Sequence, residues 1–510
     1  MTRSRRRLTS LVALLAVFAI IGAACGGGGD ETSDATDGGG PAEEAGEDAA
    51  TTDTDAQDAI DEEAAARQEA EAQQALAEAQ CPVNALDEAT GPVEITMWHA
   101  MNASLEDTII ALTDEYNATQ DRVVVSLVNQ STYATNFDTF RNASAGDRPN
   151  IVQLEETAVQ AMIDSQTALP VQACADAAGY SFDDHIDRVM AAFTVGDVVW
   201  PMPFNSSNPV LWYDRGAFAE AGLDPDAPPT TLAELREASR VLVESGAATG
   251  GFAFATGGMP WMVEQILGKA DVAYANNGNG RAGLATEVVF NTPEMVEVVT
   301  FFRDLETDGL AVNTGANPDA TANFFAFLGE TPVAMTIETS AALSSVLDQL
   351  PVLAPDLEIG VAPLPGLTSP DPGGALVGGA ALWLTEDKPD EEIAAAWDFV
   401  RWLNEPEQQA TWHLGSGYLP IRESTAALPE VVAAWEEQPA FRVPFDQLLE
   451  GNETVASSGP VMGPHTLIRD ELELGFERVL LEGLDPATMI DDLEETANEL
   501  LVDYARRTGR

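Results

Sequence analysis

Positive charge is scarce in this sequence. Its 510 residues include 24 lysines and arginines against 84 aspartates and glutamates, which gives a formal net charge of −60. Only Lys269 and Lys388 are lysines. Because nucleic-acid phosphates are bound through basic surfaces, this balance argues against nucleic-acid binding. Self-repulsion of an acidic surface keeps proteins soluble and separate, so we expect a monomer.

Motifs of nucleotide binding are also missing. No Gly-Lys pair is followed by serine or threonine, so the phosphate-cradling loop is absent. Residues 278–283 match Gly-x-Gly-x-x-Gly, but two asparagines precede them where the dinucleotide motif requires a buried strand. We therefore predict that this stretch is a loop.

The sequence also lacks the motifs that are typical of catalytic and metal-binding sites. There is no Gly-x-Ser-x-Gly elbow. Glu155 and Glu156 are adjacent, and neighbouring residues on a strand point to opposite faces, so they cannot flank one bond. The four histidines show no metal-ligand spacing: His99, His185, His413 and His465. We expect no metal, no cofactor and no catalysis, and an extracellular hydrolase is the least favoured alternative.

The N-terminus carries a secretion pattern. Four arginines among the first seven residues precede an apolar run, Leu8–Ala24, which predicts a signal peptide over residues 1–24. Small residues then lead to Cys25, which resembles the cleavage box of bacterial lipoproteins and implies a lipidated cysteine. Gly22 stands where that box usually has leucine. An uncleaved anchor helix and a signal cut elsewhere remain the alternatives.

Only three cysteines occur, and two follow the lipidation candidate: Cys81 and Cys174. A disulfide between them is permissible outside the cell, and we favour it over two buried thiols. Such a bond would close a long loop and stabilise the fold by a few kcal/mol.

Residues 25–90 have little to bury. Residues 26–55 are mostly Gly, Asp, Glu, Thr and Ala, and residues 56–80 are rich in Ala, Glu and Gln. This composition predicts a disordered acidic linker that holds the folded part away from the membrane.

The rest of the chain, residues 91–510, alternates between strand and helix patterns. Predicted strands include residues 93–98, 122–128, 150–154, 210–213 and 251–255. Predicted helices include residues 105–116, a segment from Leu232, and most of the chain after Ala394. Strands that alternate with helices favour a doubly wound α/β sheet.

One stretch is distinctive: residues 202–213 read MPFNSSNPVLWY. Other motifs follow in a fixed order along the chain: Trp98–Met101, Phe140 to Pro149, Gly378–Trp383, Trp412–His413 and Gly417–Ile421. Together they resemble family 1 extracellular solute-binding proteins of ABC importers, nearest to the members that bind glycerol phosphates. The resemblance covers the chain from about Val93 to its end.

The resemblance implies a two-lobed, type II periplasmic-binding-protein-like α/β fold, with the ligand cleft between lobes joined by crossing segments. We place the first lobe at about 91–205 and 334–380, and the second at about 206–333 and 381–510. The implied partners are a small polar ligand and the transmembrane permease subunits. The implied location is the outer face of the cell membrane, held there by the lipid anchor.

The family's ligand-binding positions carry over to eight residues. They are Tyr133, Glu156, Ser207, Trp261, Thr339, Gly379, Tyr418 and Arg469. Arginine presents a planar fork to phosphate oxygens, hydroxyls add donors, and a carboxylate accepts from ligand hydroxyls. Without the resemblance each would have an ordinary explanation, such as a surface ion pair or core packing.

Two departures bear on the ligand. Gly258 stands where the glycerol-phosphate members have the first of two tryptophans, which leaves room for a bulkier ligand, and Thr339 replaces the usual serine. With the acidic charge of the chain, this favours a glycerophosphodiester such as glycerophosphocholine over sn-glycerol 3-phosphate. A neutral oligosaccharide is the alternative.

Overall fold

The computed structural model describes residues 73–316, 321–328 and 332–509. The predicted signal peptide, Cys25 and most of the predicted linker lie outside these residues. Within the described ranges, no helix is both long enough and apolar enough to cross a membrane.

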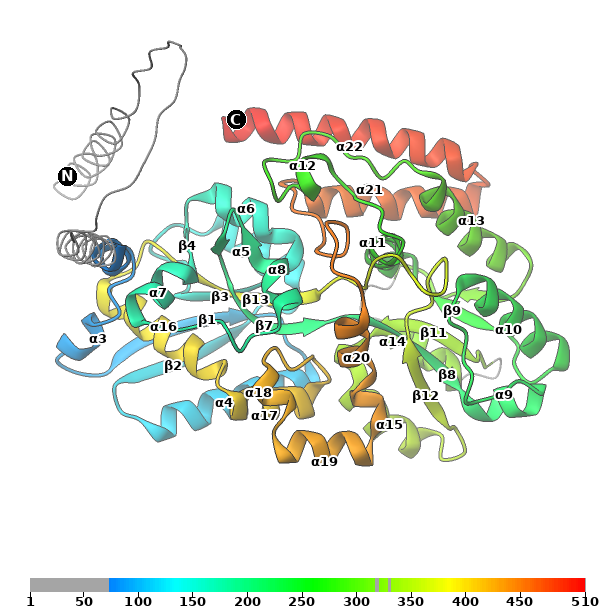
Figure 1. Cartoon of the computed structure of the whole chain (residues 1–510), viewed down its shortest axis with the longest axis horizontal. Helices are drawn as coiled ribbons and strands as arrows, with labels where there is room; N and C mark the ends of the chain where they lie inside the picture. Colours follow the sequence, from blue (N-terminus) through cyan, green and yellow to red (C-terminus); the bar gives the residue numbers. More distant parts are fainter. Residues whose placement is uncertain (1–72, 317–320, 329–331, 510) are drawn as a thin grey trace, which may run out of the picture. The chain divides into compact units, whose positions relative to one another are not determined.

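Two β-sheets organise the fold (Figure 1). The first has the strand order β2-β1-β3-β13-β4, with β7 also paired to β13. Its strands are β1 (Val93–His99), β2 (Val123–Asn129), β3 (Ile151–Glu155), β4 (Ala168–Leu169), β7 (Met202–Ser207) and β13 (Gly378–Thr385). β1 runs parallel to β2 and β3, whereas β13 is antiparallel to β3, β4 and β7.

The second sheet has the order β10-β9-β11-β8-β12. Its strands are β8 (Pro209–Asp214), β9 (Phe252–Phe254), β10 (Ala311–Asn313), β11 (Met335–Thr339) and β12 (Ile359–Pro363). The strand β8 is antiparallel to both β11 and β12. A separate hairpin pairs β5 (Thr194–Val195) with β6 (Val198–Val199).

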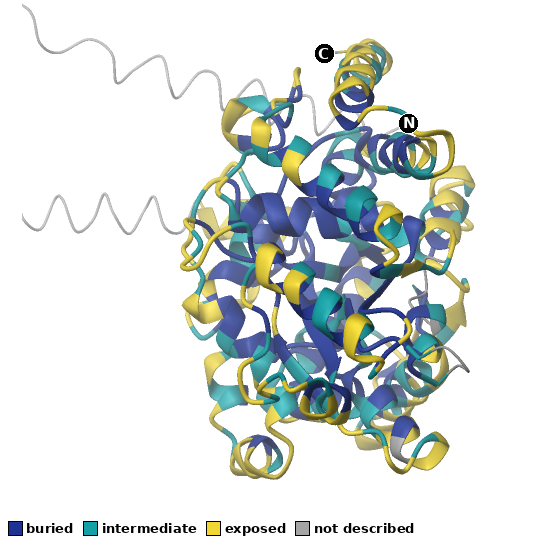
Figure 2. Ribbon diagram, turned by 90° about the vertical axis from the view of Figure 1, so that its right-hand side faces the viewer, coloured by how far each residue is buried: buried dark blue, intermediate teal, exposed yellow. Residues whose placement is uncertain are grey.

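Helices surround both sheets, and buried residues concentrate in the strands and the inward helix faces (Figure 2). Up to β6 they are α3 (Ala85–Glu88), α4 (Ala103–Thr119), α5 (Tyr133–Asn142), η1 (Glu156–Ala158), α6 (Val159–Ser165), α7 (Val171–Ala178) and α8 (Asp187–Phe193). From β8 to β12 they are α9 (Arg215–Ala221), α10 (Leu232–Ser245), η2 (Thr256–Gly258), α11 (Met259–Lys269), α12 (Asn276–Asn279), α13 (Pro293–Thr307), α14 (Thr321–Phe325), η3 (Ala326–Leu328), η4 (Ser340–Ala342) and α15 (Leu343–Leu353). After β13 they are α16 (Asp390–Leu403), α17 (Pro406–Ser416), α18 (Glu423–Ala426), α19 (Pro429–Glu437), η5 (Pro439–Phe441), α20 (Val443–Glu450), α21 (His465–Glu477), the π-helix η6 (Arg478–Glu482) and α22 (Pro486–Thr508).

The strand pairing corrects the predicted lobe boundaries. We placed 334–380 in the first lobe, but β11 and β12 belong to the second sheet. We placed 381–510 in the second lobe, but β13 lies in the first sheet and α16 packs on β1. After β13, the helices α21, η6 and α22 join the core of the second sheet, and α20 packs on β8 and β12. The motif order shows which segments are present, whereas lobe membership depends on which strands bond to each other.

The lobes exchange chain at residue 208, between β12 and β13, and again before α21 (Figure 1). At the first crossing Asn208 is fully buried. Its Nδ2 donates to the carbonyl of Pro444 at 2.8 Å, and its Oδ1 accepts from Gln447 at 3.0 Å. The helix α20 therefore fixes the point where β7 continues into β8.

The folded part begins earlier than Gly91. Residues 73–80 are helical, and Gln74 donates to the carbonyl of Ala177 at 2.9 Å. A disulfide joins Cys81 to Cys174 in α7, which is the pair that the sequence favours. The end of the predicted linker is thus tied to the first lobe by a covalent bond that composition does not reveal.

The stretch that matches the dinucleotide motif is a turn, as predicted. Residues 277–280 all have positive φ, between 53° and 80°. A Cβ at Gly280 would lie 1.9 Å from the carbonyl oxygen of Val461, so only glycine fits. No strand leads into this turn, which removes the geometry needed to bind a pyrophosphate.

Candidate functional site

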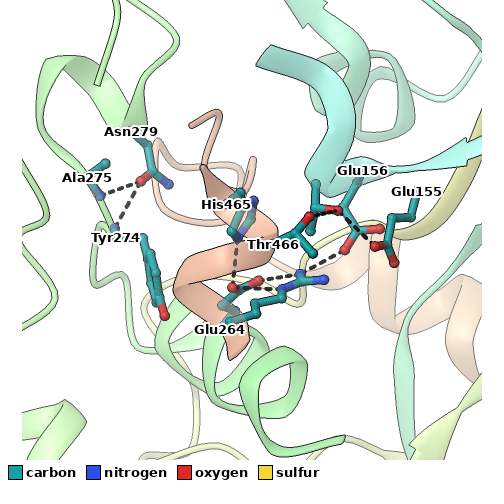
Figure 3. Close-up of polar contacts among 10 residues, drawn as sticks. Glu155, Glu156, Glu264, Tyr274, Ala275, Asn279, His465 and Thr466 are labelled. Carbon is teal, nitrogen blue, oxygen red and sulfur yellow. Dashed lines mark hydrogen bonds and ion pairs between the residues drawn. The ribbon is translucent and has the colours of Figure 1, made fainter. Parts of the chain in front are cut away.

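Arg469 on α21 is held between the carboxylates of Glu156 and Glu264. Figure 3 labels both carboxylates. Its Nη2 donates to Glu156 Oε1 at 2.8 Å and to Glu264 Oε2 at 2.5 Å, and its Nε donates to Glu264 Oε1 at 3.0 Å. Glu156 follows β3 in the first lobe, whereas Glu264 lies on α11 in the second. Arg469 therefore links the two lobes and is paired through two of its nitrogens to Glu264.

His465 reinforces this cluster from the same helix face, one turn before Arg469. Its Nε2 donates to Glu264 Oε1 at 2.8 Å, and its side chain is buried. Its Nδ1 is a buried atom without a hydrogen-bond partner among the described residues. Glu264 thus accepts from two residues of α21 at once, which fixes its carboxylate.

The pKa shifts follow from burial and from the charge of Arg469. Burial raises the pKa of Glu156, and the guanidinium of Arg469 offsets only part of that effect. Burial also favours the neutral form of Glu264, but Arg469 and His465 outweigh it and lower the pKa of Glu264 to about 2. The two carboxylates in turn overcome desolvation and raise the pKa of Arg469. Glu264 is therefore the permanently charged partner.

A small cavity of about 20 Å³ adjoins this cluster. Its walls are Glu156, Ala192, Trp261, Glu264, Gln265, Arg281, Leu376, Val377, Ser458, Gly459, Pro460, His465 and Arg469. That volume holds about one water molecule. A polar ligand of several heavy atoms therefore enters only if the lobes move apart.

The helix α11 contributes three of these side chains from one face. Trp261, Glu264 and Gln265 are spaced i, i+3 and i+4, so they lie side by side. Gln265 Oε1 accepts from the backbone N–H of Leu376 at 2.8 Å, while its Nε2 is buried without a partner in the described part of the chain. Gln265 therefore has a donor to spare beside the cavity.

A second polar group lies in the first lobe. The hydroxyls of Tyr133 and Tyr418 are 3.2 Å apart, and Asn205 Nδ2 donates to the Tyr133 hydroxyl at 2.8 Å. Gln153 Nε2 in turn donates to Asn205 Oδ1 at 2.9 Å. Burial raises the pKa of both tyrosines, so they are neutral donors, and the nearby charge of Glu156 adds to the shift at Tyr418.

Ser207 and Gly379 lie where β7 and β13 pair, and the backbones approach closely there. A Cβ on Gly379 would lie 2.0 Å from the carbonyl oxygen of Asn205, and its φ of 95° also favours glycine. One residue earlier, a Cβ on Gly378 would lie 2.8 Å from Nε1 of Trp261. Trp261 of the second lobe therefore rests against the first sheet.

Thr339 differs from the other candidates. It ends β11, and its hydroxyl accepts from the backbone N–H of Ala341 at 3.2 Å, which caps η4. The structure thus surrounds one cavity with Glu156, Trp261 and Arg469 and joins Tyr133 to Tyr418, but it gives Thr339 a local capping contact.

Sequence reasoning missed four polar residues of the site: Asn205, Glu264, Gln265 and His465. Glu264 and Gln265 could have been found from their helical spacing to Trp261, and His465 from its spacing to Arg469. Within the described ranges, no group of three or more His, Cys, Asp or Glu residues is arranged to hold a metal ion.

Two lobes with parallel strands flanked by antiparallel ones, crossing segments and a polar site between them define a type II α/β binding-protein fold, as predicted. Residues 111–442 match the family described as bacterial extracellular solute-binding protein, and the chain belongs to that family. The resemblance found in the sequence is therefore confirmed.

Relatives support the same assignment. The sn-glycerol-3-phosphate-binding periplasmic protein UgpB of Pectobacterium atrosepticum is 28% identical over 426 residues, covering 82% of this chain and 94% of the relative. Its namesake from Escherichia coli K12 is 27% identical over 420 residues, covering 81% and 94%. Both names describe binding proteins rather than enzymes.

Solved structures agree on the fold. The GacH receptor of Streptomyces glaucescens, studied unliganded and with acarbose, has a TM-score of 0.67 at 19% identity, covering 82% of this chain and 100% of that one. UgpB of Mycobacterium tuberculosis in complex with glycerophosphocholine has a TM-score of 0.65 at 20% identity, covering 81% and 99%.

Proposed function

We propose that this protein captures a glycerophosphodiester such as glycerophosphocholine, or sn-glycerol 3-phosphate, outside the cell and delivers it to the permease of an ABC importer. The observation that carries the proposal is Arg469, a cation fixed between the lobes beside Glu156 and Trp261. A neutral sugar needs no such cation. The names of the relatives at 27–28% identity support the same ligand class.

The described residues offer a contact for each part of such a ligand. Arg469 Nη1, which has no hydrogen-bond partner in the described ranges, is available to a phosphate oxygen. Glu156 is the acceptor for glycerol hydroxyls once the lobes separate, and Tyr133 and Tyr418 add neutral donors. Trp261 offers a face to the C–H groups or to a quaternary ammonium.

A ligand panel tests the proposal. We expect glycerophosphocholine or glycerol 3-phosphate to raise the thermal midpoint of the whole chain, because a ligand at about 100 times its Kd stabilises the folded state by about 2.7 kcal/mol. Maltose and trehalose serve as the oligosaccharide arm. A response to the sugars with none to the phosphates would replace this proposal with a sugar-binding function, and turnover of any compound would reveal a hydrolase.

We also propose that Cys25 carries the lipid anchor and that the protein acts as a monomer. Metabolic labelling with a radioactive fatty acid should label the chain, and a Cys25→Ser variant should lose both the label and the membrane fraction. Label that persists in that variant would place the modification elsewhere. The mass in solution, measured by light scattering, checks the monomer.

A further inference from the structure

The charges around Arg469 do not sum to a positive site. Glu156, Glu264, Arg281 and Arg469 all line the cavity. Glu155 lies beside Glu156 (Figure 3). Two cations and two carboxylates therefore line the cavity, and the charge of Glu155, outside the lining, also acts on Arg469. A phosphate group that enters this cleft meets a region whose negative charge is already at least as large as its positive charge.

Arg281 cannot serve the ligand, because its donors are taken by backbone carbonyls. Its partners are Gly459 through Nε, Ala191 and Thr194 through Nη1, and Ala192 and Ser458 through Nη2. These contacts join the segment after α12 to α8 and to residues 458–459. Arg281 is thus a structural cation, and Arg469 is the one whose remaining nitrogen faces no protein partner in the described part.

The two carboxylates that pair with Arg469 are not equivalent. Glu156 belongs to the other lobe, so its contact with Arg469 is lost when the lobes separate. Its side chain is 17% exposed. Glu264 belongs to the same lobe as Arg469, its side chain is 2% exposed, and it binds two guanidinium nitrogens. His465 holds Glu264 in place from α21. Opening therefore removes Glu156 and leaves Glu264.

We propose that Glu264 is a specificity-determining residue that cancels the charge of Arg469 and selects a phosphodiester, with its single negative charge, over a dianionic phosphate monoester. Arg469 Nη1 remains free to donate to one phosphodiester oxygen. A second negative charge on the phosphate finds no unpaired cation and is repelled by the fixed carboxylate of Glu264. This inference rests on the proposed function and narrows its ligand class.

Glu264→Gln tests the inference, since the amide keeps the shape of the side chain and can still accept from Arg469. Calorimetric titration at pH 8 compares glycerol 3-phosphate with glycerophosphocholine. We expect the affinity for the monoester to rise about tenfold relative to the diester, because one unit of charge a few ångströms from the phosphate is removed. Glu244→Gln, which removes the same charge from an exposed pair with Arg240, should leave the ratio unchanged.

The wild-type protein supplies a second test that needs no variant. The second ionisation of a phosphate monoester falls near pH 6. We expect the affinity for glycerol 3-phosphate to fall between pH 5 and pH 8 relative to that for glycerophosphocholine. The diester is the reference at each pH, because it meets the same ionisable groups that face the site, which are Glu155, Glu156, His465 and Tyr274.

The outcomes distinguish a failure of the proposed function from a failure of the role assigned to Glu264. If the wild-type protein binds neither phosphate compound, the proposed function fails. If it binds them but prefers the monoester at pH 8, or if a folded Glu264→Gln variant leaves the ratio unchanged, the role of Glu264 is overturned. If that variant does not fold, the wild-type protein provides the test. A ratio of its affinities for glycerol 3-phosphate and glycerophosphocholine that stays constant with pH overturns the role of Glu264.

Discussion

The two lobes carry different polar groups. In the first lobe, Tyr133, Tyr418 and Asn205 form a network of neutral hydroxyls and an amide. In the second lobe, Glu264 and Arg469 form a charged pair. Neutral groups recognise hydroxyls whatever the charge of the ligand, whereas the charged pair responds to charge. We therefore expect the hydroxyl network of the first lobe to contact ligand hydroxyls, and the pair of Glu264 and Arg469 in the second lobe to set the response to ligand charge.

Removal of the Arg469 guanidinium should have the largest effect on ligand affinity, because it eliminates the charged pair of the second lobe. We expect Arg469→Ala to weaken binding of a phosphate ligand at least about 100-fold, because the direct donor is lost. The folded state should also lose stability, since Glu264 is left as a buried, unpaired charge. Titration calorimetry and thermal unfolding check both results.

The matched control is Arg478→Ala, which removes an arginine from an exposed pair with Asp492 in the same C-terminal region. It should change neither the affinity nor the stability by much. Affinity that survives Arg469→Ala would show that the phosphate binds elsewhere in the cleft.

Lowering the pH should remove stabilising contributions from the two lobes in two different pH ranges. Burial lowers the pKa of His413 to about 4, and the ring is held neutral because Nδ1 donates to the carbonyl of Tyr418 while Nε2 accepts from Trp435. The unfolded state takes up the proton first as the pH falls, so this stability is present above about pH 6.5 and is lost toward pH 4. Between pH 8 and pH 5 we expect a loss of about 2 kcal/mol from His413.

The charged pair should respond only at lower pH. The pKa of Glu264 is lowered to about 2, so its contribution is complete above about pH 4.3 and falls away toward pH 2. Denaturant unfolding at several pH values measures both effects. His413→Gln should flatten the slope between pH 8 and pH 5, and an unchanged slope would assign that pH dependence to other groups.

The smallest expected effect on affinity concerns the neutral hydroxyl network of the first lobe. Tyr418→Phe removes one hydroxyl, and we expect affinity to fall about five- to tenfold, by the same factor for the monoester and the diester. Tyr213→Phe is the control, because its hydroxyl donates to the carbonyl of Pro225 and takes no part in the network of Tyr133, Tyr418 and Asn205. If Tyr418→Phe changed the preference between the two ligands, the division of roles between the lobes would be wrong.

Local patterns identified much of this protein in advance. The stretch 202–213 becomes β7 and β8, and Trp261 and Arg469 both reach the cavity. The hydroxyl of Thr339 also caps η4, a contact that the motif does not reveal, and its role in ligand binding stays a prediction. The lobe boundaries failed for a related reason, since strand pairing joins segments that the sequence separates.

The α/β class and the family could be inferred from the sequence alone, because they depend on periodicity and motif order, and the secretion signal stays a prediction from composition. The pairing of Glu264 with Arg469 could not be inferred in this way, because it depends on how the chain packs. The two residues are separated by 205 positions, and α11 and α21 must pack together before they meet. The charge of a binding site depends on such contacts, since a cation acts on a ligand only with what its protein partners leave uncompensated.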